Sequence, residues 1–123
     1  MALTIWHNPR CSKSRQTLAL IEAAGIEPEV RLYLDDPPPP GELAATLDLL
    51  GIEPWELART GEPLAKELGL RDLPRDEQNR AEWVRIMSAN PKLIERPVVI
   101  TDDGRARLGR PPENIEELLG SAD

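Results

Sequence analysis

The hydrophobic pattern at the start of the chain changes period within a few residues. Residues 3–6 form a short apolar run that ends just before an Asn-Pro turn signal. Residues 12–24 instead carry apolar side chains three and four apart, and Gly25 follows them as a helix terminator. The pattern therefore predicts a buried strand, a turn and a helix with one apolar face.

A second strand is predicted shortly after this helix. Val30, Leu32 and Leu34 alternate with Arg31 and Tyr33, which is the period-two pattern of a half-buried strand. Together the three elements form a βαβ unit, whose two strands are expected to run parallel.

The middle of the chain is predicted to be helical. Four consecutive prolines, 37–40, end the second strand, and apolar residues three or four apart recur after them. The last predicted helix starts at Asp76, turns Ala81, Val84 and Met87 inward, and ends before Pro91. The helices before it are expected at 43–50 with Gly51 as terminator, at 54–58, and at 62–68 with Gly69 as terminator.

The final third returns to strands. Residues 97–101 predict a buried strand, Asp102-Asp103-Gly104 a three-residue hairpin loop, and 105–108 an antiparallel return strand. A last helix is expected from Pro112, with Ile115, Leu118 and Leu119 facing the core. The order βαβ, helices, ββα predicts an α/β protein with a thioredoxin/glutaredoxin-like fold, in which helices flank a mixed sheet. We expect a single domain over 1–123, with a helical insertion at about 41–90.

Composition excludes several classes of function. A formal net charge of −7 over 123 residues argues against a general nucleic-acid or membrane-surface binder. A single cysteine excludes an internal disulfide framework and suits a reducing cytosol, so we expect a cytoplasmic protein. The N-terminus shows no charged leader and no long apolar segment. A monomer is the default expectation, because no apolar oligomer face is evident.

The single cysteine lies where the first helix is predicted to begin. Backbone N–H groups at a helix N-terminus, together with nearby cations, lower the pKa of a thiol and also bind oxyanions. Cys11 has Arg10, Lys13 and Arg15 around it, and His7 lies four residues before it. Cys11 is therefore a candidate nucleophile inside an anion site. The alternatives are a space-filling thiol, which would leave the cationic cluster unexplained, and a metal site, for which one Cys and one His supply too few ligands.

Two arginines far along the chain are expected to join this site. In the predicted topology, Arg96 at the start of the third strand lies beside the N-terminus of the first helix, and Arg110 returns to the same edge after the hairpin. Guanidinium groups match a tetrahedral oxyanion bidentately. The alternative for each is a surface arginine, which is the interpretation we favour for Arg105 and Arg107. Local sequence leaves the role of Arg59 open.

With these residues in place, the chain resembles the glutaredoxin-coupled arsenate reductase (ArsC) family, in particular its shorter chromosomal members. The resemblance covers essentially all 123 residues, and its first and last two segments are specific in combination. The matching segments are 7–15, Tyr33-Leu34, Arg59 with Glu62-Pro63, 67–70, 90–99 and 109–113.

The resemblance implies a role for each candidate residue. Cys11 would be the nucleophile, and Arg59, Arg96 and Arg110 would bind arsenate. The resemblance also implies a cis Arg96–Pro97 bond. Three further residues would stabilise the thiolate: His7, Ser14 and Arg15.

The implied reaction reduces arsenate to arsenite without a bound cofactor or metal. The Cys11 thiolate would attack arsenic, glutathione as co-substrate would attack the adduct, and glutaredoxin would remove the glutathione as a mixed disulfide. Because Ser14 stands where a dithiol motif has its second cysteine, an external thiol is required.

Two other functions remain as hypotheses. The chain could be a glutathione-dependent thiol reductase on the same fold, although retention of all three arginines argues against it. It could also be a non-enzymatic regulator resembling the Spx proteins, which share the fold and bind RNA polymerase. Spx-like switching uses a Cys-x-x-Cys pair, and Ser14 breaks that pair.

Overall fold

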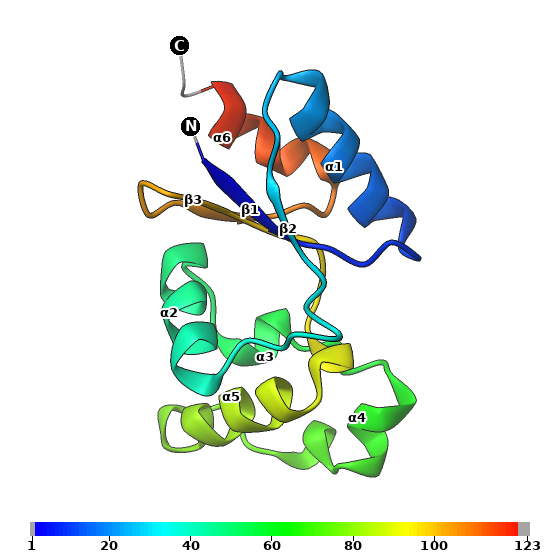
Figure 1. Cartoon of the computed structure of the whole chain (residues 1–123). Coiled ribbons are helices and arrows are strands. Elements are labelled where there is room, and N and C mark those ends of the chain that lie inside the picture. Colours follow the sequence, from blue (N-terminus) through cyan, green and yellow to red (C-terminus); the bar gives the residue numbers. More distant parts are fainter. Residues whose placement is uncertain (1, 121–123) are drawn as a thin grey trace. The chain divides into compact units, whose positions relative to one another are not determined.

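The computed structural model describes residues 2–120, and the chain divides into two compact units (Figure 1). The first, which we call the sheet unit, comprises the chain up to Asp36 and from Arg96 onward. The second, the helical unit, comprises Pro37–Glu95.

The sheet unit is built on a mixed four-stranded sheet, as predicted. Its strands occur in the order β2-β1-β3-β4, with β1 parallel to β2 and antiparallel to β3, and β3 antiparallel to β4. In register, Ile5 on β1 pairs with Val30 on one side and Val99 on the other. The strand bounds are Leu3–Trp6 (β1), Glu29–Arg31 (β2), Val98–Thr101 (β3) and Ala106–Leu108 (β4).

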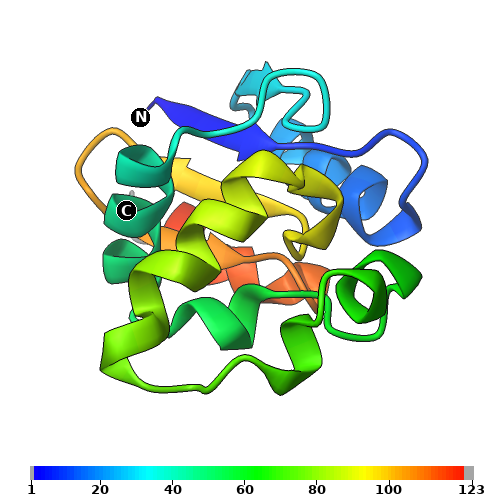
Figure 2. The same ribbon diagram turned by 90° about the horizontal axis from the view of Figure 1, so that it is seen from below.

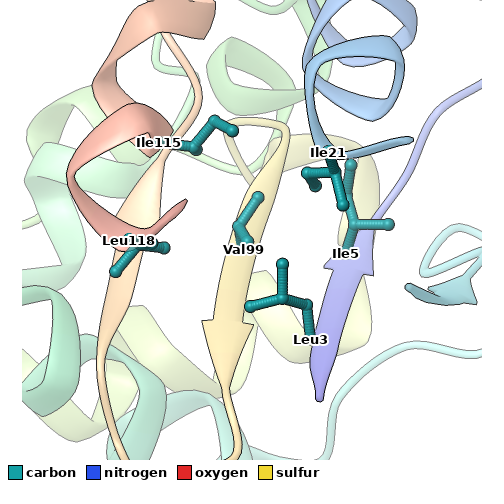
Figure 3. Packing of buried hydrophobic residues seen from close by; sticks show 6 residues of the cluster. All are labelled: Leu3, Ile5, Ile21, Val99, Ile115 and Leu118. Carbon is teal, nitrogen blue, oxygen red and sulfur yellow. The ribbon is translucent and has the colours of Figure 1, made fainter. Parts of the chain in front are cut away.

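One face of this sheet carries the core of the unit (Figure 3). Helix α1 (Ser12–Ala23), the 3₁₀ turn η4 (Pro112–Ile115) and helix α6 (Glu116–Gly120) cover that face. The side chains involved are buried and apolar, and burial of this kind supplies most of the folding free energy. They are Leu3, Ile5, Ile21, Val99, Ile115 and Leu118.

The second strand is shorter than the apolar alternation predicts, and its apolar residues are exposed. Val30, Leu32 and Leu34 are 44%, 43% and 42% exposed, whereas Tyr33 between them is buried. The strand β2 ends at Arg31, and Leu32 and Leu34 lie in or beside the turn that follows it. Val30 pairs in register with the buried Ile5 and therefore shares its face of the sheet, but β2 is the edge strand and Val30 remains exposed there.

The helical unit is a cluster of short helices in which α2 and α3 pack against α5 (Figure 2). Prolines start three of the helices, because the missing N–H of proline costs nothing in a first turn. Gly51 ends α2 in the left-handed conformation with φ 70°, as the sequence predicts. The bounds are Pro40–Leu50 (α2), Pro54–Leu57 (α3), Pro63–Glu67 (α4), Leu70–Asp72 (η1), Glu77–Asn79 (η2), Arg80–Ala89 (α5) and Pro91–Leu93 (η3).

The buried face of α5 differs from the prediction at one position. Val84 and Met87 are buried as predicted, but Ala81 is exposed and Trp83 is buried in its place. Trp83 lies four residues before Met87, so both fall on one helix face. The larger indole ring buries more apolar area than an alanine methyl group does.

No helix within residues 2–120 is long and apolar enough to span a lipid bilayer.

Candidate functional site

The turn that ends β1 places Cys11 at the start of α1. The Cys11 N–H donates to the Asn8 carbonyl over 3.0 Å, and the extended backbone of Cys11 (φ −97°, ψ 123°) makes it the N-cap of the helix. An N-cap side chain normally accepts a hydrogen bond from the N–H groups two and three residues on. Here those groups belong to Lys13 and Ser14, so a thiolate would supply the acceptor that the helix terminus requires.

Opposing effects set the acidity of this thiol. Burial alone would raise the pKa of Cys11, a residue that is 8% exposed. The backbone N–H of Ser14, the Arg96 guanidinium, the backbone N–H of Lys13 and the Arg110 guanidinium all favour the thiolate. Together they outweigh burial, and the pKa of Cys11 lies below its ordinary value. The site therefore favours the nucleophilic form of the cysteine.

Both predicted arginines of the sheet unit act on this cysteine through their charge, and Arg110 contacts it. Arg110 Nη1 lies 3.9 Å from Cys11 Sγ and donates to the Arg96 carbonyl over 3.4 Å. Each arginine precedes a cis proline, at Arg96–Pro97 and at Arg110–Pro111. The first cis bond was expected from the family resemblance, and the second was not.

Gly109 and Thr17 join the arginine segments to the helix, a role that sequence reasoning missed. The Gly109 N–H donates to the Pro97 carbonyl over 2.8 Å, and the Thr17 hydroxyl lies 3.4 Å from the Gly109 carbonyl. A Cβ at Gly109 would lie 2.6 Å from Thr17 Oγ1 and 2.8 Å from Pro97 Cγ. Glycine is therefore required for the residue before Arg110 to pack against α1. The only indication of this packing in the sequence was the glycine of the Gly-Arg-Pro-Pro segment.

His7 and Ser14 form a second layer beside the cysteine. The His7 Nδ1 and Ser14 Oγ atoms are 2.6 Å apart, and Ser14 Oγ accepts the Asn8 N–H over 3.0 Å. Arg15 Nη1 donates to the Pro9 carbonyl over 2.8 Å. Burial, and then the charge of Arg15, lower the pKa of His7, so the imidazole is neutral near pH 7. These contacts hold the 7–11 turn against the first turn of α1 and involve all three predicted supporting residues.

Arg59 lies in the helical unit and is held there by acidic partners. Its Nη2 is 2.7 Å from Glu62 Oε1 and its Nε is 3.8 Å from Glu95 Oε1, while Nη1 lies 3.4 Å from the Lys92 carbonyl. The sheet unit thus brings together Cys11 and two of the three predicted arginines. That Arg59 joins them stays a prediction.

The other basic residues of the C-terminal third behave as surface groups, as favoured above. Arg105 pairs with Asp103 over 3.0 Å, and Arg107 pairs with Glu117 over 3.2 Å. Exposed ion pairs of this kind contribute little to stability. Across residues 2–120, no three His, Cys, Asp or Glu side chains gather as a metal-binding group.

The charge around Cys11 leads to a prediction for its reactivity. We expect iodoacetamide to alkylate Cys11 with a pH midpoint below the value of about 8.5 for a free thiol. Arg110→Ala removes one of the cations that favour the thiolate, so the midpoint should rise and the rate at pH 7 should fall several-fold. Arg107→Ala, which removes a surface arginine, is the matched control. A wild-type midpoint at the free-thiol value would contradict the activated thiolate.

A second prediction concerns the only histidine in the chain. Because the fold disfavours the charged form, the imidazole NMR signal of His7 should titrate with a midpoint below the ordinary 6.5. The contribution of neutral His7 to stability should correspondingly be lost as the pH falls below 6.5. The denatured chain, titrating near 6.5, is the control. A native midpoint at or above that value would contradict the structure.

The chain is similar to known proteins over nearly its whole length. The model of the ArsC family matches residues 6–118. An arsenate reductase of Haemophilus influenzae is 43% identical over 120 residues, covering 97% of this chain and 100% of its own length. The uncharacterized protein YfgD of Escherichia coli K12 is 48% identical over 117 residues, covering 94% and 95%.

Solved structures give the same result. An arsenate reductase from Vibrio cholerae superposes with a TM-score of 0.87 at 45% identity, over 95% of this chain and 97% of that one. Since sequence family, relatives and fold agree over nearly the whole length, the chain belongs to the ArsC family.

Proposed function

We propose that the protein is an arsenate reductase that takes its electrons from glutathione and glutaredoxin. The observation that carries the proposal is the Cys11 thiol of lowered pKa with Arg110 Nη1 3.9 Å from its sulfur and Arg96 beside it. A nucleophilic sulfur among guanidinium groups suits an electrophile that is itself an anion. Relatives described as arsenate reductases support this choice of oxyanion.

In this proposal three arginines bind the substrate. Arg96 and Arg110 would balance the charge of arsenate at the sulfur, and Arg59 would complete the set from the helical unit. Guanidinium groups offer N–H donors in a planar fork, which suits tetrahedral oxygens better than the point charge of lysine does. Their positive charge would also offset the charge that builds on the oxyanion during attack.

The chemical step would begin at Cys11. The thiolate attacks arsenic to form an S–As bond, and one arsenate oxygen leaves as water after taking up protons. Glutathione then attacks this adduct, and glutaredoxin removes the glutathione as a mixed disulfide. Over the cycle, arsenic gains two electrons, the sulfurs of glutathione and glutaredoxin each lose one as their S–S bond forms, and Cys11 returns as a thiolate. Arsenite is the product.

The external thiols are needed because the chain has a single cysteine. Position 14, where a dithiol motif has its second cysteine, is a serine whose hydroxyl meets His7. Glutathione and glutaredoxin act in a reducing compartment, so we place the reaction in the cytosol. We also propose that the chain works as a monomeric single domain.

Three residues would support the nucleophile without touching arsenate. Ser14 would stabilise the thiolate through its backbone N–H and connect it to His7 through its hydroxyl. Arg15 would hold the 7–11 turn through the Pro9 carbonyl. These are positioning roles, since each acts through Cys11 or its loop.

The test is arsenate-dependent NADPH oxidation with glutathione, glutaredoxin and glutathione reductase. We expect turnover by the wild type, none by Cys11→Ser, and a loss of about 10²–10³-fold in kcat/KM for Arg96→Ala, as for removal of one oxyanion-stabilising donor. Arg107→Ala should match the wild type.

Two outcomes would contradict the proposal. Turnover in Cys11→Ser above a few per cent of the wild-type rate would exclude the covalent route. No turnover by the wild type, with Cys11 still alkylated rapidly near neutral pH, would move the substrate to a glutathionylated thiol.

A further inference from the structure

The Arg59 side chain is surrounded by contacts within the helical unit. Two contacts fix its backbone. The Arg59 N–H donates to the Leu93 carbonyl over 2.7 Å, and the adjacent Ala58 pairs with Ile94 in an antiparallel bridge. The Glu62 N–H then donates to the Arg59 carbonyl over 3.1 Å, which closes the Thr60-Gly61 turn. Glu62 therefore lies three residues on, within reach of the guanidinium.

The guanidinium is held along one edge. Glu62 Oε1 lies 2.7 Å from Nη2, and Glu95 Oε1 lies 3.8 Å from Nε. Nε and Nη2 form the same side of the planar group, so the two carboxylates share it. A guanidinium has five N–H donors, and the contacts with Glu62, Glu95 and the Lys92 carbonyl engage at most three of them within residues 2–120. The remaining N–H donors can serve a ligand.

The position of Glu62 suits a role in orienting the Arg59 guanidinium. Its side chain is 15% exposed and that of Arg59 is 24% exposed, so solvent screens this pair less than it screens the surface pairs. Its second oxygen, Oε2, lies 3.9 Å from Lys92 Nζ, so the carboxylate has a partner on each side. Glu62 is the N-cap residue of α4 but makes no side-chain capping bond there within the described chain.

We propose that Glu62 is a positioning residue for oxyanion binding: its carboxylate fixes the Arg59 guanidinium so that the remaining N–H donors face a tetrahedral anion. This inference rests on the proposed function, in which Arg59 binds arsenate. It deepens that function by naming an acidic residue on which anion binding depends. A flexible arginine would lose side-chain entropy on binding, and prior fixation removes that cost.

The effect on anion binding expected from this positioning role is opposite to the effect expected from charge alone. Removing a negative charge beside an anion site should strengthen anion binding if charge alone counts. If Glu62 orients Arg59, its removal should weaken binding instead. The direction of the change therefore separates the two explanations.

The experiment measures how oxyanions protect Cys11 from alkylation by iodoacetamide, with arsenate and the unreactive sulfate as probes. We expect Glu62→Ala to weaken protection about tenfold, while the alkylation rate without anion stays at the wild-type value. Glu62→Gln should recover part of the loss, because the amide oxygen still accepts from Arg59. Glu67→Gln on the same helix is the matched control, since it removes an exposed acid.

A double-mutant comparison tests whether Glu62 acts through Arg59. In an Arg59→Ala background, Glu62→Ala should have no further effect on protection. Unchanged or tighter binding in Glu62→Ala, or the same loss in the Arg59→Ala background, would overturn the proposal. If instead no oxyanion protects wild-type Cys11, it is the proposed function that fails.

Discussion

A buried sulfur at a helix N-terminus is the feature on which the candidate site depends. The first turn of α1 needs an acceptor for its N–H groups, and the residue at the N-cap is Cys11 rather than the usual serine, threonine or aspartate. Burial disfavours a charge there, so the thiolate is favoured only because the N–H groups of Lys13 and Ser14 and two guanidinium groups act together. The candidate nucleophile and the proposed anion site therefore depend on the same groups.

The sheet topology explains why residues almost a hundred positions apart meet at this sulfur. Because β3 is antiparallel to β1, the start of β3 lies beside the end of β1, where the 7–11 turn begins. The end of β4 returns to that same edge, since β4 is antiparallel to β3. Arg96 precedes β3 and Arg110 follows β4, so both come to the cysteine. Gly109 allows the close packing against Thr17 that this convergence requires.

The sequence alone was enough to predict the parts of this arrangement that depend on local pattern and topology. The strand before Cys11, the helix after it and the convergence of Arg96 and Arg110 follow from hydrophobic period and element order. The extent and burial of β2 did not, because the strand ends at Arg31 and lies at the edge of the sheet, where Val30 is exposed although it pairs with the buried Ile5. The buried face of α5 was also misassigned, since packing in three dimensions selected Trp83.

Contacts between distant segments were beyond local reasoning. The Thr17–Gly109 contact joins residues 92 positions apart. It requires glycine because a Cβ at position 109 would clash with Thr17, and the sequence does not show that the two residues meet. The pairing of Arg59 with Glu95 likewise depends on the bridge between Ala58 and Ile94. The sequence shows that an arginine is present, but contacts of this kind determine where its guanidinium group lies.

The central claim is that the Cys11 thiolate itself attacks the oxyanion. The most direct measurement is the ultraviolet absorbance of the thiolate after rapid mixing with arsenate in the absence of glutathione. Because the chain has one cysteine, the signal belongs to one sulfur. The account predicts a loss of thiolate absorbance at a rate that saturates with arsenate, no loss with sulfate, and recovery when glutathione and glutaredoxin are added. Unchanged absorbance with arsenate, in protein that still turns over once both thiols are supplied, would contradict it.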